Sequence, residues 1–313
     1  MNDNAMNISI VIPAYNEAKN LEDLVKQIDN SFSKSKYSHV YEIVIINDGS
    51  TDNSDEIGEK ICNQFQKITF INLKENISKA YSLDTGIHYA KGKIIATMDA
   101  DLQYNPKDLI KMIDLIYSGY DLVNGKREKR QDNFITKFFS RIYNFFLRFT
   151  FNVKLNDFFS GIKVFKREIY DLMEFSGLSR FVIFFSKKYN YQIKEVSIEH
   201  SVRKKGKTSY SFIDRVILSI KDIFTLAICI VLEKRGIYQI KQSILSIFLI
   251  LTIGFIIDEI FFKSFNNYFL TFLIASFFIF TILNIIIQNF LKSKERDSFN
   301  LKKNIKTMEI SKI

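Results

Sequence analysis

The chain has 313 residues, with 44 Lys and Arg against 34 Asp and Glu, so its formal net charge is +10. This length allows one large domain or two small ones, and the basic excess favours nucleic acid, anionic lipid or a phosphorylated small molecule as partner. The two cysteines, Cys62 and Cys229, are far apart, which excludes a disulfide framework and a cysteine-based metal site. The polar N-terminus predicts no signal peptide.

Short apolar runs alternate with amphipathic stretches over the first 125 residues. This alternation predicts an α/β fold in which a mostly parallel sheet lies between helices. The predicted strands are residues 8–12, 41–46, 68–73, 94–98 and 122–123, and the predicted helices are residues 18–33, 52–66, 78–90 and 106–118.

Polar clusters follow three of these strands, at residues 13–17 (PAYNE), 47–52 (NDGSTD) and 99–103 (DADLQ). Ligands of such sheets bind beyond the carboxyl ends of the strands, so we expect the clusters to share one site. Asp99 and Asp101 are one residue apart at a strand end, where alternation points both side chains the same way. Two neighbouring carboxylates suit Mg²⁺ or Mn²⁺ holding a diphosphate.

The next segments are less regular. Residues 126–150 are basic and aromatic, which is compatible with an amphipathic helix on a membrane or with a solvated basic helix. Residues 156–161 (NDFFSG) predict a turn before an apolar stretch. Residues 192–198 predict a strand that leads into the basic segment 200–210.

Two long apolar stretches dominate the C-terminal part. Residues 268–291 carry no charge and as a helix would span about 36 Å, enough to cross a bilayer. Residues 240–262 are a second candidate span. Basic residues flank the pair, so the positive-inside rule predicts an integral membrane protein with both termini and the catalytic domain in the cytoplasm. The expected organisation is a catalytic domain (1–212), an amphipathic juxtamembrane segment (213–239), two membrane helices (240–291) and a basic tail (292–313).

The polar clusters together resemble those of family 2 inverting glycosyltransferases, which have the GT-A nucleotide-diphospho-sugar fold. Gly125-Lys126-Arg127, Asp157 with Ser160-Gly161, and Arg203-X-X-Gly-X-Thr-X-Tyr are similar to motifs of the polyprenyl-phosphate glycosyltransferases. The resemblance implies transfer of one sugar, with inversion, from a UDP- or GDP-linked donor to polyprenyl phosphate.

The resemblance also implies roles for individual residues. Asp99, Asp101 and Gln103 would hold the Mg²⁺ or Mn²⁺. The expected catalytic residues are Asp101, Asp157 and Arg127, with Asp157 orienting the acceptor site or the metal-bound sugar. The expected donor-binding residues are Pro13, Tyr15, Glu17, Asp48, Lys79, Asp99 and Ala100. The expected lipid-phosphate ligands are Arg127, Arg203, Lys207 and Thr208, with Arg130, Arg141 and Arg180 as weaker candidates.

Local alternatives stay open for three of these acids. Asp48 also suits an ordinary turn and helix cap, Glu17 suits the acid of a helix N-terminus, and Asp157 suits a turn. The sequence departs from the family pattern at Ser78, where a glycine is usual, at Lys93, where an acid is usual, and at Ile162-Lys163, where Phe-Arg is usual.

Rival functions are a processive polysaccharide synthase, a transferase with a hydroxyl acceptor, and a catalytically silent membrane subunit. The absence of tryptophan argues against the synthase, whose motif includes one. The basic motif at residues 203–210 argues against the hydroxyl acceptor, and the paired acids argue against a silent subunit. No nucleic-acid-reading motif is present. Two membrane helices favour a homo-oligomer.

Overall fold

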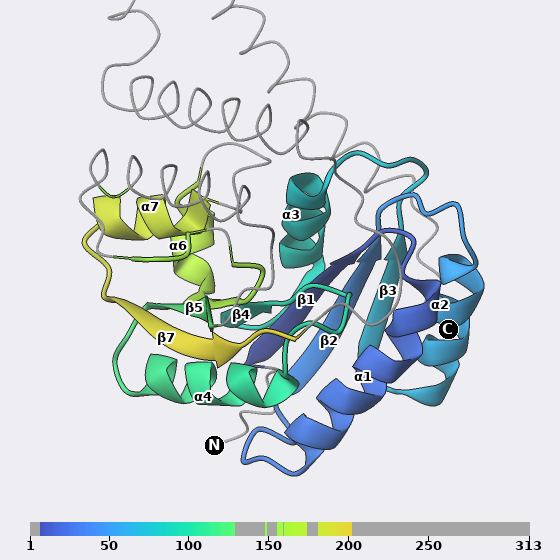
Figure 1. Cartoon of the computed structure of the whole chain (residues 1–313), viewed down its shortest axis with the longest axis horizontal. Coiled ribbons are helices and arrows are strands. Elements are labelled where there is room, and N and C mark those ends of the chain that lie inside the picture. Colours follow the sequence, from blue (N-terminus) through green and yellow to red (C-terminus); the bar gives the residue numbers. More distant parts are fainter. Residues whose placement is uncertain (1–6, 129–147, 149–154, 159, 174–180, 202–313) are drawn as a thin grey trace, which may run out of the picture. The chain divides into compact units, whose positions relative to one another are not determined.

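The computed structural model describes residues 7–128, 148, 155–158, 160–173 and 181–201. They form a seven-stranded sheet with helices on both faces (Figure 1). The strands are β1 (Ile8–Ala14), β2 (Tyr41–Asn47), β3 (Ile68–Asn72), β4 (Ile94–Thr97), β5 (Leu122–Glu128), β6 (Lys163–Lys166) and β7 (Ile193–Glu199). The helices are α1 (Ala18–Ser33), α2 (Ser54–Gln64), α3 (Lys79–Tyr89), α4 (Pro106–Tyr117), α6 (Arg167–Asp171) and α7 (Val182–Lys188).

The sheet has the strand order β3-β2-β1-β4-β6-β5-β7. Its strands run parallel except for β6, which is antiparallel to both of its neighbours, β4 and β5. The predicted α/β fold with a mostly parallel sheet is confirmed, with one reversed strand that the sequence showed only as an apolar stretch. Because β6 is reversed, the residues that precede it lie at the edge where the other strands have their carboxyl ends. We call this edge the carboxyl rim.

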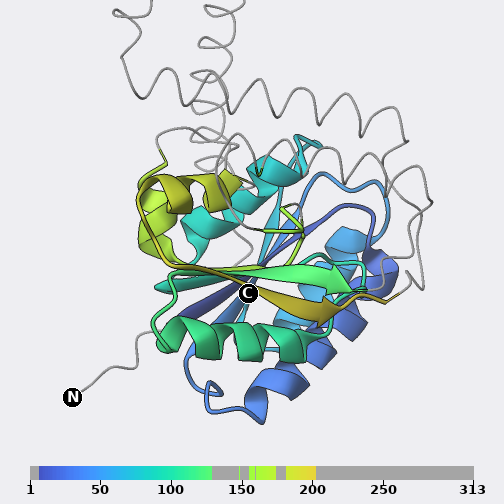
Figure 2. The same ribbon diagram turned by 60° about the vertical axis from the view of Figure 1, so that its left-hand side comes forward.

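The helices cover both faces of the sheet, with α1 and α4 on one side and α3, α6 and α7 on the other (Figures 1 and 2). Helix α1 has apolar residues at helical spacing, which gives it one face to bury against the strands. The buried apolar residues of this helix are Leu21, Leu24, Val25, Ile28 and Phe32. Strands β1 and β2 are buried along their whole length, as expected for parallel strands covered on both sides.

Strand β5 is longer than the predicted residues 122–123. Its second half, residues 125–128, pairs with residues 196–199 of β7. This pairing joins segments about seventy residues apart, so the local apolar pattern does not reveal it. It places Arg127 on a strand of the sheet.

The predicted membrane spans, residues 240–262 and 268–291, lie outside the described residues, as do the juxtamembrane segment and the basic tail. In the part of the chain that the structure describes, no helix has the length and apolar character needed to cross a bilayer.

Arg167 at the start of α6 satisfies the end of helix α3. Its guanidinium donates hydrogen bonds to the carbonyls of Ile87 at 3.0 Å, Ala90 at 2.5 Å and Gly92 at 2.8 Å. The last carbonyls of a helix have no partner within the helix, and a cation there also suits the helix dipole.

Replacing Arg167 with Ala should therefore lower the free energy of unfolding by about 1.5–3 kcal/mol, the usual loss for hydrogen bonds to a charged group. Denaturant unfolding of the purified protein measures this loss. The exposed Lys187 on α7 is the control, and Lys187→Ala should unfold like the wild type. Equal unfolding of both variants would contradict the capping role.

Candidate active site

The loop after β1 is tied to the loop after β2. The backbone N–H of Asn16 donates to Ser50 Oγ at 2.8 Å, and the backbone N–H of Thr51 donates to Asn16 Oδ1 at 2.8 Å. Asn16 has φ 57°, a left-handed conformation in which Asn is enriched. In the first cluster Pro13 is buried and Tyr15 is half-buried. These bonds bring the first two polar clusters together at the carboxyl rim.

Glu17 is the N-cap residue of α1. Its carbonyl accepts from the backbone N–H of Asn20 at 2.8 Å, and its Oε2 accepts from Asn20 Nδ2 at 2.5 Å. A carboxylate at this position is stabilised by the positive end of the helix dipole. The structure thus gives Glu17 the local role that the sequence left open, and its role toward a nucleotide stays a prediction.

Asp48 lies buried at the end of β2 and bonds to the segment that precedes α3. Its Oδ1 accepts from the backbone N–H of Ile77 at 3.0 Å. Burial raises the pKa of Asp48 above its usual value, although hydrogen bonds from Ile77, Ser82 and Ser78 oppose the rise. Ser78, which replaces the usual glycine, is the N-cap of α3 and accepts from Tyr81 N–H at 3.5 Å. The departure at Ser78 therefore adds a helix cap next to Asp48.

Asp99 lies two residues beyond the end of β4 and pairs with Lys79, the first residue of α3. Lys79 Nζ lies 2.5 Å from Asp99 Oδ1. Burial by itself would raise the pKa of Asp99, but the charge and hydrogen bond of Lys79, followed by the charges of Arg127 and Lys163, hold it below its ordinary value. Asp99 is therefore ionised at neutral pH and lies within a group of basic side chains.

Gly161 packs directly against the Asp99 carboxylate. A Cβ at this position would lie 2.2 Å from Asp99 Oδ2, so a larger residue would displace the acid. The Gly161 N–H donates to Tyr104 Oη at 3.0 Å, and Thr97 Oγ1 donates to the Gly161 carbonyl at 3.1 Å. The glycine before β6 is thus required by the close approach of the Asp99 side chain to its backbone at the rim.

Asp101 and Gln103 lie on the turn that follows Asp99. Leu102 has φ 60°, Asp101 Oδ1 accepts from the Gln103 N–H at 3.3 Å, and Gln103 Nε2 donates to the Ser201 carbonyl at 3.0 Å. Strand β4 ends at Thr97, before Asp99 and Asp101. The turn, rather than strand alternation, therefore orients these two acids.

The donor set on this turn fits a divalent ion that binds together with its substrate. Asp99 and Asp101 supply hard carboxylate oxygens, and Mg²⁺ commonly takes one or two carboxylates while substrate phosphates complete its shell. Within the described ranges, no group of three or more His, Cys, Asp or Glu side chains is placed to hold an ion by itself.

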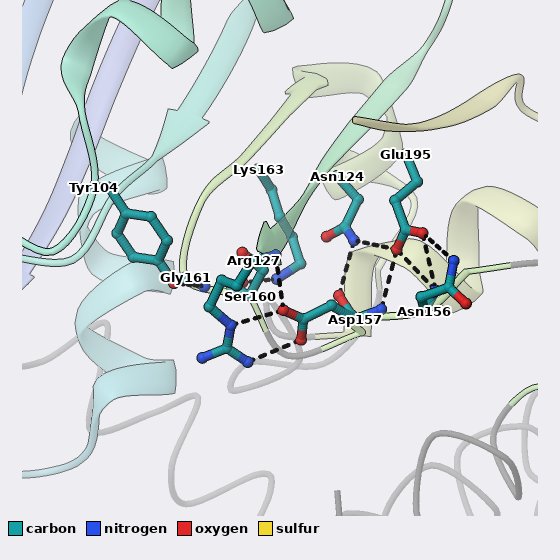
Figure 3. Close-up of polar contacts among 9 residues, drawn as sticks. All are labelled: Tyr104, Asn124, Arg127, Asn156, Asp157, Ser160, Gly161, Lys163 and Glu195. Carbon is teal, nitrogen blue, oxygen red and sulfur yellow. Dashed lines mark hydrogen bonds and ion pairs between the residues drawn. The ribbon is translucent and has the colours of Figure 1, made fainter. Parts of the chain in front are cut away.

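Arg127 and Asp157 form a bidentate ion pair at the same rim (Figure 3). Arg127 Nε lies 2.7 Å from Asp157 Oδ2, and Nη2 lies 2.8 Å from Oδ1. The two side chains are only 16% and 7% exposed. Two parallel hydrogen bonds fix the plane of the guanidinium as well as its position. Asp157, which the sequence also allowed as a simple turn residue, is thus the partner of Arg127.

Three polar residues that sequence reasoning did not assign to the site lie side by side across neighbouring strands. Asn124 of β5 is paired in register with Lys163 of β6 on one side and with Glu195 of β7 on the other. Burial lowers the pKa of Lys163 to about 8, partly opposed by the negative charge of Asp157. Its ammonium group donates to the Ser160 carbonyl. Two sequence signals indicated this row, the polar residue directly after the apolar pair 122–123 and the place of Lys163 where the family motif usually has an arginine.

Several expected residues are not brought into the site by the described part of the chain. Arg203, Lys207 and Thr208 lie outside the described residues, and so do Arg130, Arg141 and Arg180. The described chain ends at Ser201, which is bonded to Gln103 and precedes Arg203 by two residues. Ala100 is buried in the hydrophobic core, with 3% of its surface exposed.

The Arg127–Asp157 pair gives a test that does not depend on activity. Removing one partner of a buried pair leaves an uncompensated charge, so Asp157→Ala should lower the free energy of unfolding by about 3–5 kcal/mol. Replacing both partners with apolar residues, Arg127→Met with Asp157→Leu, should cost less than the single change. Denaturant unfolding measures both.

The control is Glu22 at the protein surface, whose Oε1 lies 2.7 Å from Lys26 Nζ and whose Oε2 lies 3.0 Å from Lys60 Nζ. Glu22→Ala should change stability little, because exposed ion pairs are screened by solvent. A loss at Asp157 no larger than the loss at Glu22 would show that the Arg127 pair is not a buried interaction in solution.

Comparison with known proteins agrees with this geometry. The sequence profile described as glycosyl transferase family 2 matches residues 9–173, just over half of the 313-residue chain. The matched segment runs from β1 to the end of α6 and includes all three polar clusters, Arg127 and Asp157.

Curated relatives point in the same direction. Undecaprenyl-phosphate 4-deoxy-4-formamido-L-arabinose transferase of Proteus mirabilis (strain HI4320) is 26% identical over 242 residues, covering 77% of this chain and 72% of that protein. The protein of the same name from Shewanella sediminis (strain HAW-EB3) is 30% identical over 218 residues, covering 69% and 65%. The resemblance to polyprenyl-phosphate glycosyltransferases is thereby confirmed.

Solved structures share the fold. Mannosyl-3-phosphoglycerate synthase from Rubrobacter xylanophilus has a TM-score of 0.58 at 14% identity, covering 74% of this chain and 75% of that one. Glucosyl-3-phosphoglycerate synthase from Mycobacterium tuberculosis, in complex with Mn²⁺ and uridine-diphosphate-glucose, has a TM-score of 0.53 at 16% identity, covering 71% and 78%. The chain belongs to glycosyl transferase family 2 and is a glycosyltransferase with the GT-A fold.

Proposed function

We propose that this enzyme transfers a single sugar from a UDP- or GDP-linked donor to polyprenyl phosphate, with inversion and with the help of a divalent ion. The observation that supports the proposal most is electrostatic. Lys79, Arg127 and Lys163 all act on the half-buried Asp99 at the carboxyl rim, where ligands of α/β sheets bind.

A phosphate acceptor explains why cations gather there. A phosphate monoester is largely ionised near neutral pH, since its second pKa is about 6, so it needs no strong general base. It does need positive charge that lets it approach a negatively charged diphosphate. Undecaprenyl phosphate appears in the names of the curated relatives, which supports a polyprenyl phosphate as acceptor.

The donor would lie over the three polar clusters. Asp48 at the end of β2, with Pro13 and Tyr15 from the loop after β1, would line the nucleoside pocket, and Asp99 and Asp101 would face the diphosphate. A divalent ion held by Asp99, Asp101 and Gln103 would offset the charge that develops on the leaving nucleotide. The solved mycobacterial neighbour holds Mn²⁺ and UDP-glucose on the same fold, which supports a divalent ion together with a nucleotide sugar.

The acceptor would approach from the side of β5 and β7. Arg127 is held there by Asp157, and its planar guanidinium suits phosphate oxygens. Arg203, Lys207 and Thr208 would complete the acceptor site. Their segment begins just after Ser201, which is bonded to Gln103.

The enzyme would work at the membrane because its acceptor is a lipid. Residues 240–262 and 268–291 are the proposed spans, and the basic residues that flank them favour cytoplasmic termini and a cytoplasmic catalytic domain. Association of the two helices with those of another copy would give a homo-oligomer.

The direct test uses membranes that contain the protein, a panel of radiolabelled nucleotide sugars, and polyprenyl phosphate. We expect label from one donor in the lipid extract, and an inverted anomeric configuration of the product by NMR. Asp101→Asn should reduce transfer at least about a hundredfold, because charge stabilisation by a metal is worth several kcal/mol. It should also weaken Mn²⁺ binding in the presence of nucleotide diphosphate, followed by electron paramagnetic resonance.

The matched control is Glu59→Gln on the exposed side of α2, which should leave both readouts unchanged. Unchanged transfer and unchanged Mn²⁺ binding in Asp101→Asn would show that Asp101 is not a ligand of the divalent ion. If label were found on a hydroxyl-bearing saccharide or protein and none on lipid phosphate, the acceptor would be a hydroxyl group and not polyprenyl phosphate.

A second prediction concerns Arg203. Replacing Arg203 with Ala should raise the apparent KM for polyprenyl phosphate about tenfold or more, as expected for one hydrogen-bonded charge. The KM for the nucleotide sugar should stay within about twofold. Steady-state kinetics with each substrate varied in turn measures both constants. Equal changes in the two constants would mean that Arg203 does not belong to the acceptor site.

A further inference from the structure

We propose that Glu195 of β7 is a positioning residue for the transfer reaction. It holds the turn that carries Asp157, and through Asp157 it sets the place of Arg127 in the acceptor site. The inference rests on the proposed function, which makes Arg127 a ligand of the acceptor phosphate.

The Glu195 carboxylate binds the Asn156–Asp157 turn through several donors (Figure 3). Its Oε1 accepts from the backbone N–H groups of Asn156 at 2.8 Å and Asp157 at 3.0 Å. Its Oε2 accepts from Asn156 Nδ2 at 2.7 Å. One carboxylate thus fixes two consecutive backbone amides and a side chain, which leaves the turn little freedom to shift.

Asn124 strengthens this arrangement from the neighbouring strand. Its Nδ2 donates to the Asp157 carbonyl at 2.8 Å and lies 3.4 Å from Glu195 Oε1. Asn124 is fully buried and is paired with Glu195 in the β5–β7 ladder. The turn is therefore held by two side chains whose places are set by the register of the sheet, a more rigid support than a loop provides.

The Asn156–Asp157 turn determines the orientation of the Arg127 side chain. The Asp157 carboxylate receives Arg127 Nε at 2.7 Å and Nη2 at 2.8 Å, so any displacement of the turn moves or breaks this pair. A displacement of about 1 Å at a reacting group can cost about a hundredfold in rate. Glu195 accepts directly from the backbone amides of the turn, including that of Asp157, so we place the effect of Glu195 in the position of Asp157.

The test compares Glu195→Ala and Glu195→Gln with the wild type in the lipid-transfer assay. Glu195→Ala should raise the apparent KM for polyprenyl phosphate about tenfold or more, with the donor KM within about twofold. Glu195→Gln keeps one acceptor oxygen for the backbone amides but turns an amide donor toward Asn156. Its apparent KM for polyprenyl phosphate should therefore lie between those of the wild type and Glu195→Ala. If the Ala variant does not fold, judged by thermal unfolding, the Gln variant decides.

The matched control is Glu199, an exposed acid on the same strand. Glu199 is four residues further along β7, so its side chain points to the same face of the sheet, but its register partner is Glu128 and not Asn124. Glu199→Ala should transfer sugar at the wild-type rate. Equal kinetics of the Glu195 and Glu199 variants would overturn the inference.

A double-mutant cycle separates positioning from general stability. If Glu195 acts through Asp157, Glu195→Ala should change kcat/KM by less than about twofold in an Asp157→Asn background, whereas independent effects would multiply. Multiplying effects would overturn the inference. If the wild type transfers no sugar to lipid phosphate but uses another acceptor, the proposed function fails, and the same cycle with that acceptor still decides the role of Glu195.

Discussion

Asp99 and Asp157 bring two negative charges to the carboxyl rim, and Lys79, Arg127 and Lys163 surround them with positive charge. Charges that lose water must be paired, or the site would neutralise itself by shifting its pKa values. Both pairing of charges and a shifted pKa are present at this rim. Asp99 keeps its charge because its basic neighbours outweigh burial, whereas burial lowers the pKa of Lys163 to about 8.

This balance depends on the reversal of one strand. Since β6 runs antiparallel to β4 and β5, the segment that precedes it returns to the carboxyl rim instead of the opposite edge. Gly161 then packs against Asp99, and Asp157 reaches Arg127. A parallel strand in this position would place both residues at the far edge of the sheet. The fold therefore joins a half built from the first four strands, which carries the three polar clusters, to a half built from β5, β6 and β7, which carries Arg127.

Part of the site was predictable because its residues are concentrated in short motifs. Asp99, Asp101, Asp48 and the loop after β1 follow strands whose apolar character is plain, so their place at one rim follows from the alternation of strands and helices. Arg127 and Asp157 came from resemblance, and the structure adds that they bind each other. The roles of the individual residues in catalysis remain predictions for the experiments above.

Sequence alone determined the order of strands and helices as far as β5, the acidic cluster after the fourth strand and the family, because each is written in neighbouring residues. Only the tertiary structure decided that Lys163, Asn124 and Glu195 lie in one row and that Glu195 supports the Asp157 turn. These contacts join residues as far as 71 positions apart, between Asn124 and Glu195. They arise from strand register around a reversed β6, which no local pattern of apolar and polar residues encodes.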